Sequence, residues 1–204
     1  MSLLRRVRSA VRHLRTGQRE ELKDSVRAFL WTRQEVRIYS ADLAAGYPKP
    51  ALDPRAEIHA GTPEDLARFR ALPECARTEF YRDEIDGAEP FVAYWDGEPA
   101  HIAWVYDHTR PARFVKLGPG EAELGYGYTL QAHRRRGFYP LTAGVMAAEL
   151  AGRGFRRLYG HIFVYSAAYA MGLEWAVRRA HFHKTGTVEY LRVLGVQLRP
   201  HLAF

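Results

Sequence analysis

The fold of this chain is decided by residues 121–150, E-A-E-L-G-Y-G-Y-T-L-Q-A-H-R-R-R-G-F-Y-P-L-T-A-G-V-M-A-A-E-L. Residues 123–130 alternate as a strand does, because successive side chains of a strand point to opposite faces. The expected faces are Leu124, Tyr126, Tyr128 and Leu130 on one side, and Glu123, Gly125, Gly127 and Thr129 on the other. A basic turn follows. From Pro140, placed at the first helical position, the apolar spacing is that of a helix that ends at Gly152.

A strand that enters a helix through a glycine-containing turn forms a site for anions. The first backbone N–H groups of the helix have no partner within it, and they lie at the positive end of the helix dipole. Arg134, Arg135 and Arg136 raise the positive potential at this point further. The stretch therefore predicts a phosphate-binding site.

This turn also carries a family resemblance. The run Arg134-Arg135-Arg136-Gly137-Phe138-Tyr139, followed by Pro140, resembles the acyl-CoA pyrophosphate loop of the GCN5-related N-acetyltransferase superfamily, whose pattern is Arg/Gln-x-x-Gly-x-Gly/Ala. Arg134 and Gly137 match that pattern, whereas Tyr139 stands where the family usually has a small residue. The alternative interpretation is a basic surface turn ahead of an ordinary helix. The resemblance covers residues 56–196.

The resemblance implies a co-substrate and the residues that hold it. The co-substrate is acetyl-CoA or another acyl-CoA, and no metal is implied. Its pantetheine arm pairs with the backbone of the strand before the loop, and an N–H of that strand stabilises the oxyanion. The implied cofactor-binding residues are Tyr128, Thr129, Leu130, Arg134, Arg135, Arg136, Gly137, Phe138 and Tyr139.

The order of elements predicts an α/β fold. Strands are expected at 36–43, 57–60, 91–95, 99–106, 123–130, 157–164 and 187–196, and helices at 2–15, 20–31, 62–72, 74–83, 140–152 and 167–179. Asp96-Gly97 is typical of a tight hairpin turn. The pattern favours a mixed, mainly antiparallel twisted sheet with helices on both faces, the acyl-CoA N-acyltransferase fold. We expect residues 1–55 to form a basic helical extension with an edge strand, and 56–204 to form the acyltransferase domain.

Composition excludes several classes of protein. The chain has 204 residues, enough for one ordinary domain, and its single cysteine, Cys75, rules out a disulfide framework. No apolar run has the length of a membrane span or the form of a secretory signal, so we expect a cytoplasmic protein. Residues 1–38 hold ten Lys/Arg against four Asp/Glu, and the remainder is almost neutral. Nucleic-acid binding is therefore not expected, because such proteins usually carry their basic patch on the folded body.

The basic N-terminal segment has two interpretations. Residues 2–15 have an apolar stripe, Leu3, Leu4, Val7, Val11 and Leu14, between arginines. Such a helix docks on its own body or on a second subunit, as in a homodimer, or it lies on an anionic membrane surface. The stripe is short and has no Trp or Phe, which favours docking.

The candidate catalytic residues follow from the chemistry of acyl transfer. The amine must lose a proton and the departing thiolate must gain one. Glu123 lies eleven residues before Arg134, a spacing similar to that of the general base in the histone-modifying members of the superfamily. The family's usual acid is a tyrosine in the penultimate helix, but Val177 stands there, so Tyr169 and Tyr165 are the candidates. His161 is a further candidate base or acid, with a core role as the alternative.

Taken together, these observations predict an N-acetyltransferase. The expected reaction transfers an acyl group to a primary amine of a small molecule, such as an amino sugar or an amino acid, by direct attack in a ternary complex. The alternatives are a catalytically weak acyl-CoA-binding module and a membrane- or partner-docking protein that uses residues 2–15. No metal site is expected, since His181 and His183 lack a third ligand.

Overall fold

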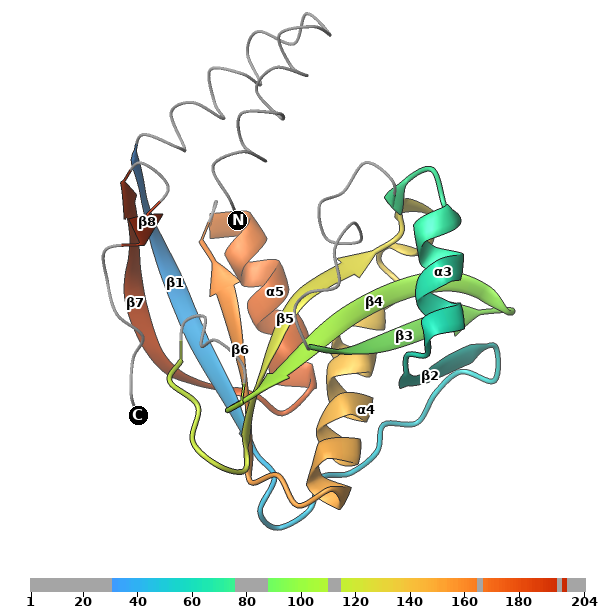
Figure 1. Ribbon diagram of the computed structural model, residues 1–204, viewed down its shortest axis with the longest axis horizontal. Helices are drawn as coiled ribbons and strands as arrows, with labels where there is room; N and C mark the ends of the chain where they lie inside the picture. The colour runs from blue at the N-terminus through green and yellow to red at the C-terminus, as the bar shows by residue number, and fades with distance from the viewer. Residues whose placement is uncertain (1–30, 76–87, 110–114, 165–166, 194–195, 198–204) are drawn as a thin grey trace, which may run out of the picture.

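The computed structural model describes residues 31–75, 88–109, 115–164, 167–193 and 196–197. In this part of the chain eight strands form one sheet in the order β2-β3-β4-β5-β6-β1-β7-β8 (Figure 1). The strands are β1 (Trp31–Asp42), β2 (Ala56–Ala60), β3 (Glu89–Trp95), β4 (Glu98–Asp107), β5 (Glu121–Thr129), β6 (Arg157–Phe163), β7 (His183–Val193) and β8 (Val196–Gln197). The helices are α3 (Pro63–Ala71), α4 (Phe138–Gly152) and α5 (Ala167–Arg179).

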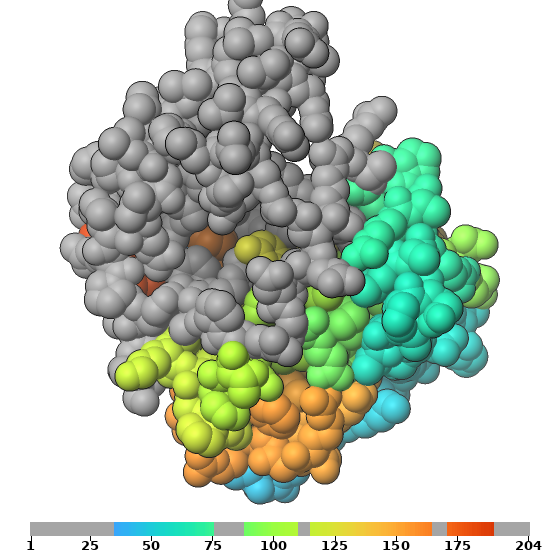
Figure 2. All heavy atoms as spheres, in the orientation of Figure 1, coloured from blue at the N-terminus to red at the C-terminus, as the bar shows by residue number. Residues whose placement is uncertain are grey.

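Helices cover both faces of the sheet. On one face, Phe69 of α3 is buried in a cluster with Ile102 and Trp104 of β4. On the other face, residues of α4 and α5 such as Met146 and Val177 pack on the intervening strand residues. In Figure 1, α3 lies over β3 and β4, and α4 and α5 lie on the other side of the sheet. Residues of α3 are at the right of the space-filling view in Figure 2.

The predicted fold class is confirmed. All strand pairs are antiparallel except β5 with β6, so the sheet is mixed and mainly antiparallel. The hairpin between β3 and β4 turns at Asp96 and Gly97, both with positive φ, as a tight turn requires. Helix α3 begins at Pro63, directly after the capping residue Thr62, which bonds reciprocally with Asp65.

The predicted edge position of the N-terminal strand is wrong. Strand β1 pairs with β6 on one side and with β7 on the other, so it lies inside the sheet. Its buried side chains, which include Val36, Ile38 and Ala41, fit this position because an interior strand packs on both faces. The strand of the expected extension therefore belongs to the same sheet as the strands of residues 56–197.

The predicted faces of β5 are also wrong beyond Gly125. The register between β4 and β5 shifts by one residue, since Trp104 pairs with Gly125 whereas Ile102 pairs with Tyr128. Tyr126 has a φ of 50° at this bulge. An extra residue in one strand reverses the side-chain alternation after it. Tyr126 and Tyr128 therefore pack on the α3 face, while Leu124 packs on the opposite face with α4.

Several predicted elements lie outside the described residues. These are the helix at 2–15, the helix at 20–31 except for Trp31, which is instead the first residue of β1, and nearly all of the helix at 74–83. Among the described residues, no helix is long and apolar enough to cross a membrane. Within the same ranges, no group of three or more His, Cys, Asp or Glu side chains is placed to hold a metal ion.

Candidate active site

The parallel strands β5 and β6 separate in the middle of the sheet. They pair from Glu121 with Arg157 as far as Leu124 with Gly160, and beyond this point they no longer pair with each other. Strand β5 continues to Thr129 on the β4 side, and β6 continues to Phe163 on the β1 side. The sheet therefore opens between two of its central strands, and an extended ligand can reach both faces there.

Helix α4 begins next to this opening with an uncapped N-terminus. Gly137 is the capping residue, with a φ of 80°, and no side chain caps the first turn. The helix begins at Phe138, two residues before the predicted start, so Pro140 is its third residue and not its first. The first turn of α4 lies at the positive end of the helix dipole, which favours an anion at this point.

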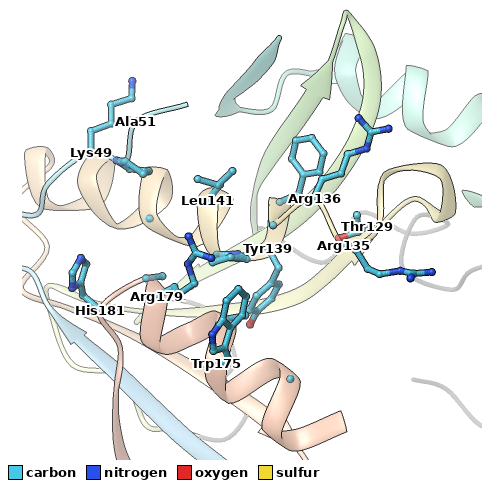
Figure 3. A pocket seen from close by; sticks show the side chains of 18 of the residues that line it. Lys49, Ala51, Thr129, Arg135, Arg136, Tyr139, Leu141, Trp175, Arg179 and His181 are labelled. Atoms are coloured by element: carbon cyan, nitrogen blue, oxygen red, sulfur yellow. The ribbon is translucent and has the colours of Figure 1, made fainter. Parts of the chain in front are cut away.

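A cavity of about 640 Å³ lies at this helix terminus, on the face covered by α4 and α5. Four cationic side chains line it, and its lining includes no Asp or Glu from the described residues. Lys49 comes from the segment after β1, Arg135 and Arg136 from the turn before α4, and Arg179 from the end of α5 (Figure 3). An uncompensated positive cavity of this kind attracts anions.

The floor of the cavity is tightly built around Gly127. A Cβ atom on Gly127 would lie 2.9 Å from Tyr139 Cε2, so only glycine allows the ring to rest on the strand. Behind it, His101 is 1% exposed, and its Nδ1 lies 2.7 Å from Thr129 Oγ1. Burial lowers the pKa of His101 to about 3, so the imidazole is neutral at neutral pH. This neutral ring orients the Thr129 hydroxyl in the cavity wall.

On the opposite face, Glu123 and His161 form a buried pair. Glu123 Oε1 lies 2.9 Å from His161 Nδ1, and the two side chains are 1% and 7% exposed. The approach is close enough for an ion pair, although the carboxylate is not aligned as a hydrogen-bond acceptor. Glu123 belongs to the last but one pair of β5 with β6 before the strands separate, and His161 is the first residue of β6 after the last pair. A carboxylate and an imidazole at this position can accept and release protons.

Comparison with known proteins identifies the fold but not the sequence family. No family model matches the chain, and no curated protein does either. Solved structures do match it. One is a putative GNAT-family acetyltransferase from Novosphingobium aromaticivorans, with a TM-score of 0.52, 22% identity, and coverage of 78% of this chain and 63% of that one.

Two further matches agree. A GCN5-related N-acetyltransferase from Kribbella flavida has a TM-score of 0.53 and 15% identity over 83% of this chain and 62% of its own. A GCN5-related glucosamine N-acetyltransferase region of a fungal multi-domain β-N-acetylglucosaminidase has a TM-score of 0.56 and 16% identity over 87% of this chain and 22% of its own. The chain has the fold of the GCN5-related N-acetyltransferases. It spans less than two thirds of the length of each of these three proteins.

Most of the residues predicted to bind the cofactor meet in the cavity of this acetyltransferase fold. Those that line it are Thr129, Arg135, Arg136, Gly137, Phe138 and Tyr139. The side chains of Tyr128, Leu130 and Arg134 do not. The Tyr128 hydroxyl donates to Glu74 at 2.7 Å, Leu130 is buried on the α3 face, and Arg134 Nε donates to the Thr129 carbonyl at 3.3 Å.

Glu74 also accepts the Gln131 N–H at 2.9 Å. The Gln131 amide is therefore already engaged, and the part of the turn that lines the cavity is the segment from Arg135 to Tyr139.

The predicted catalytic residues are placed unequally. Glu123 lies at the separation of β5 and β6, on the same face as Tyr126 and not on the opposite face as predicted. Tyr165 lies outside the described residues, and Tyr169 belongs to α5 although its side chain is not among those described.

Sequence analysis missed three features of the site. These are the pairing of His161 with Glu123, and the cavity positions of Trp175 and Lys49. The first had no signal in the sequence, because Glu123 and His161 meet only through the pairing of β5 with β6.

Proposed function

We propose that this protein is an acyl-CoA-dependent N-acyltransferase that uses acetyl-CoA or a close analogue and acylates a primary amine of a small molecule. One observation carries the proposal: the opening between β5 and β6 has an anion-binding cavity on one face and a buried carboxylate–imidazole pair on the other. Two reactants can therefore approach the same point from opposite faces, as direct attack in a ternary complex requires.

The donor occupies the cavity on the α4 face. Its diphosphate binds at the N-terminus of α4, to the guanidinium groups of Arg135 and Arg136. Its pantetheine arm follows β5 past the Thr129 hydroxyl toward the opening, as the family resemblance implies for Tyr128, Thr129 and Leu130. The acyl carbon then lies between the two strands.

The amine reacts from the face of Glu123 and His161. The amine nitrogen forms a bond to the thioester carbonyl carbon, the carbon–sulfur bond breaks, and the electron pair leaves with the thiolate. The Glu123–His161 pair accepts the proton that the nitrogen loses, and the thiolate takes up a proton from an acid. Tyr169 and Tyr165, at and just before the start of α5, remain the proposed acids.

The proposed acceptor is an amino sugar or an amino acid. The chain outside its first 38 residues is almost neutral, which gives no reason to expect a polycationic acceptor. A protein of similar fold is named for glucosamine N-acetylation, which supports an amino sugar as the first acceptor to test. A cytoplasmic location, a homodimer, and docking of residues 2–15 on a partner or a membrane surface remain predictions.

Calorimetric titration with acetyl-CoA tests the donor site. We expect the full chain to bind with a Kd on the order of 1–100 µM, and Gly137→Trp to abolish binding. No atom lies within 4 Å of a Cβ at Gly137, so the indole fills the cavity and not the core. Gly154→Trp is the matched control, because Gly154 has a similar φ of 85° and equally open surroundings beyond the other end of α4. Both variants carry the same backbone strain of about 1–2 kcal/mol.

Turnover separates an enzyme from a binding module. Release of free thiol from acetyl-CoA is followed with a panel of amino sugars and amino acids at neutral pH. Amine-dependent thiol release supports the proposal, whereas tight binding with no amine-dependent release would establish the acyl-CoA-binding module instead. If neither wild type nor Gly154→Trp binds acetyl-CoA, the turn before α4 is only a basic surface feature and the proposed function is wrong.

A further inference from the structure

The last residue of β3, Trp95, has a ring that contacts two guanidinium groups. The central carbon of the Arg55 guanidinium lies 4.2 Å from the centre of the Trp95 ring, and that of Arg136 lies 4.8 Å from it. A cation at this distance is attracted by the face of an aromatic ring. Arg136 lines the cavity, whereas Trp95 does not. The tryptophan therefore lies behind one of the cations in the cavity wall.

The Trp95 ring is fixed in place by its packing. It packs on a cluster of buried residues that includes Ile58 and Val145. It also meets the ring of Phe138 edge to face, with the ring centres 5.9 Å apart and the planes at 90°. Phe138 is the first residue of α4 and is buried. An indole has only two side-chain torsions, so a ring packed in this way forms a rigid surface beside the start of α4.

The second cation on the ring, Arg55, is held by a carboxylate. Its Nε and Nη2 donate to the two carboxylate oxygens of Asp53, each at 3.1 Å. These hydrogen bonds hold the pKa of Asp53 below its usual range. Because the charge of Arg55 is compensated, it repels another cation on the same ring less. Arg136, in contrast, forms no ion pair with any residue that the structure describes.

Arg135 provides a contrast within the same turn. It also lines the cavity, but its φ is 64°, and among the described residues no aromatic ring lies against its guanidinium. Figure 3 shows Arg135 and Arg136 leaving the turn in different directions. A free arginine side chain loses much of its rotamer freedom when a ligand fixes it. Arg136 has given up part of that freedom already, because the ring holds its guanidinium.

We infer that Trp95 is a positioning residue that holds the Arg136 guanidinium at the N-terminus of α4 before an anion arrives. Stacking uses the face of a guanidinium and leaves its N–H groups, which lie in the plane, able to donate. Arg136 can therefore contact the ring and a diphosphate at the same time. That this diphosphate belongs to an acyl-CoA rests on the proposed function, whereas the positioning of the cation does not.

The first test asks whether the aromatic ring matters or only its bulk. Calorimetry on the full chain measures the affinities for acetyl-CoA and for inorganic pyrophosphate. Trp95→Leu keeps an apolar side chain but has no ring, and we expect it to weaken both ligands about fivefold. Trp95→Phe keeps an aromatic face and should restore most of the affinity. Thermal unfolding of both variants establishes that they are folded.

The second test asks whether Trp95 acts through Arg136. Arg136→Gln should weaken acetyl-CoA binding about tenfold, and adding Trp95→Leu to it should cause no further loss, because the ring then has no guanidinium to position. Arg135→Gln is the matched control background. In that background Trp95→Leu should still weaken binding about fivefold, since Arg135 does not contact the ring.

The outcomes separate this inference from the proposed function. Equal weakening by Trp95→Leu and Trp95→Phe, no weakening by Trp95→Leu, or the same further loss in both arginine backgrounds overturns the positioning role. Tighter binding by Trp95→Leu also overturns it, because the ring would then draw Arg136 away from the anion. If pyrophosphate binds in a manner dependent on Trp95 but acetyl-CoA does not bind, the positioning role stands and the proposed function fails. If the wild type binds neither ligand, both fail.

Discussion

The two faces of the opening between β5 and β6 are built from opposite kinds of chemistry. On the α4 face, the cavity is open and lined by four cationic side chains, and the described residues add no carboxylate to its lining. On the α3 face, Glu123 and His161 are almost completely buried and lie beside each other. One face holds cations that a ligand can neutralise, and the other holds a carboxylate and an imidazole that lie against each other away from solvent.

This difference separates binding from reaction. Solvent-exposed cations attract a distant anion, but salt screens this attraction. Each of the four cations supplies only part of it, so the loss of one should weaken binding without abolishing it. A buried pair is screened much less, and removing one partner leaves the other in a poor solvent. We therefore expect changes in the cavity to act on the affinity for the donor, and changes in the pair to act on the rate of the chemical step.

The largest effect is expected from Glu123→Gln. The amide keeps the size of the carboxylate but cannot share a proton with His161, so general base catalysis is lost. We expect kcat to fall on the order of 10²–10⁴-fold, with the calorimetric affinity for acetyl-CoA unchanged. Steady-state rates with the amine found in the acceptor panel measure the first, and titration measures the second.

The double variant shows whether the pair acts as one unit. His161→Gln alone and Glu123→Gln with His161→Gln should each be about as slow as Glu123→Gln, since residues that act together are not additive. Multiplicative losses would mean that the two residues act separately. A loss of acetyl-CoA affinity in Glu123→Gln would remove the distinction between the two faces.

The elements of the fold were readable from the sequence because their signals are local. Thr62 and Pro63 begin α3, Asp96 and Gly97 turn the hairpin, and Gly152 ends α4 as predicted. The position of β1 was not readable. Its alternation shows that it is a strand, but whether it lies at an edge or between β6 and β7 depends on pairing with residues more than 100 positions away.

The site shows the same limit at the scale of one residue. The Gly125-Tyr126-Gly127-Tyr128 repeat hides the bulge, because alternation continues in the sequence while the side chains change faces. The turn between β5 and α4 was predictable from a strand, a glycine and a helix in succession, and its binding of phosphate stays a prediction. The Glu123–His161 pair was not, since the two residues meet only through the register of the parallel strands, 38 positions apart.

A smaller effect is expected from the histidine beneath the cavity. His101 is buried and its pKa is about 3 in the folded protein, against about 6.5 in the unfolded chain. The unfolded chain therefore takes up the proton first as the pH falls. Stability is fully present above about pH 6.5 and is lost as the pH falls toward 3, by about 2 kcal/mol between pH 7 and pH 5.

Urea unfolding of the wild type and of His101→Gln at these two pH values measures this loss. The glutamine amide can still contact the Thr129 hydroxyl but does not titrate, so the variant should lack this part of the pH dependence. An equal pH dependence in both proteins would show that His101 is not the group responsible. The result tests whether His101, beneath the exposed cavity, is shielded from water as completely as Glu123 and His161 are on the other face.

The smallest effect is expected from salt, and it compares the two faces within one protein. Raising the ionic strength from 0.05 to 0.5 M shortens the distance over which exposed charges act to a few ångströms. The KM for acetyl-CoA should therefore rise by roughly a few fold, while kcat at saturating donor stays the same, because Glu123 and His161 are buried. Arg136→Gln should reduce the salt dependence of KM, since it removes one of the four exposed cations. Initial rates at five salt concentrations decide the matter: a salt-dependent kcat would mean that the pair is open to solvent during the reaction, and a salt-independent KM would mean that the cavity cations do not meet the phosphates of the donor.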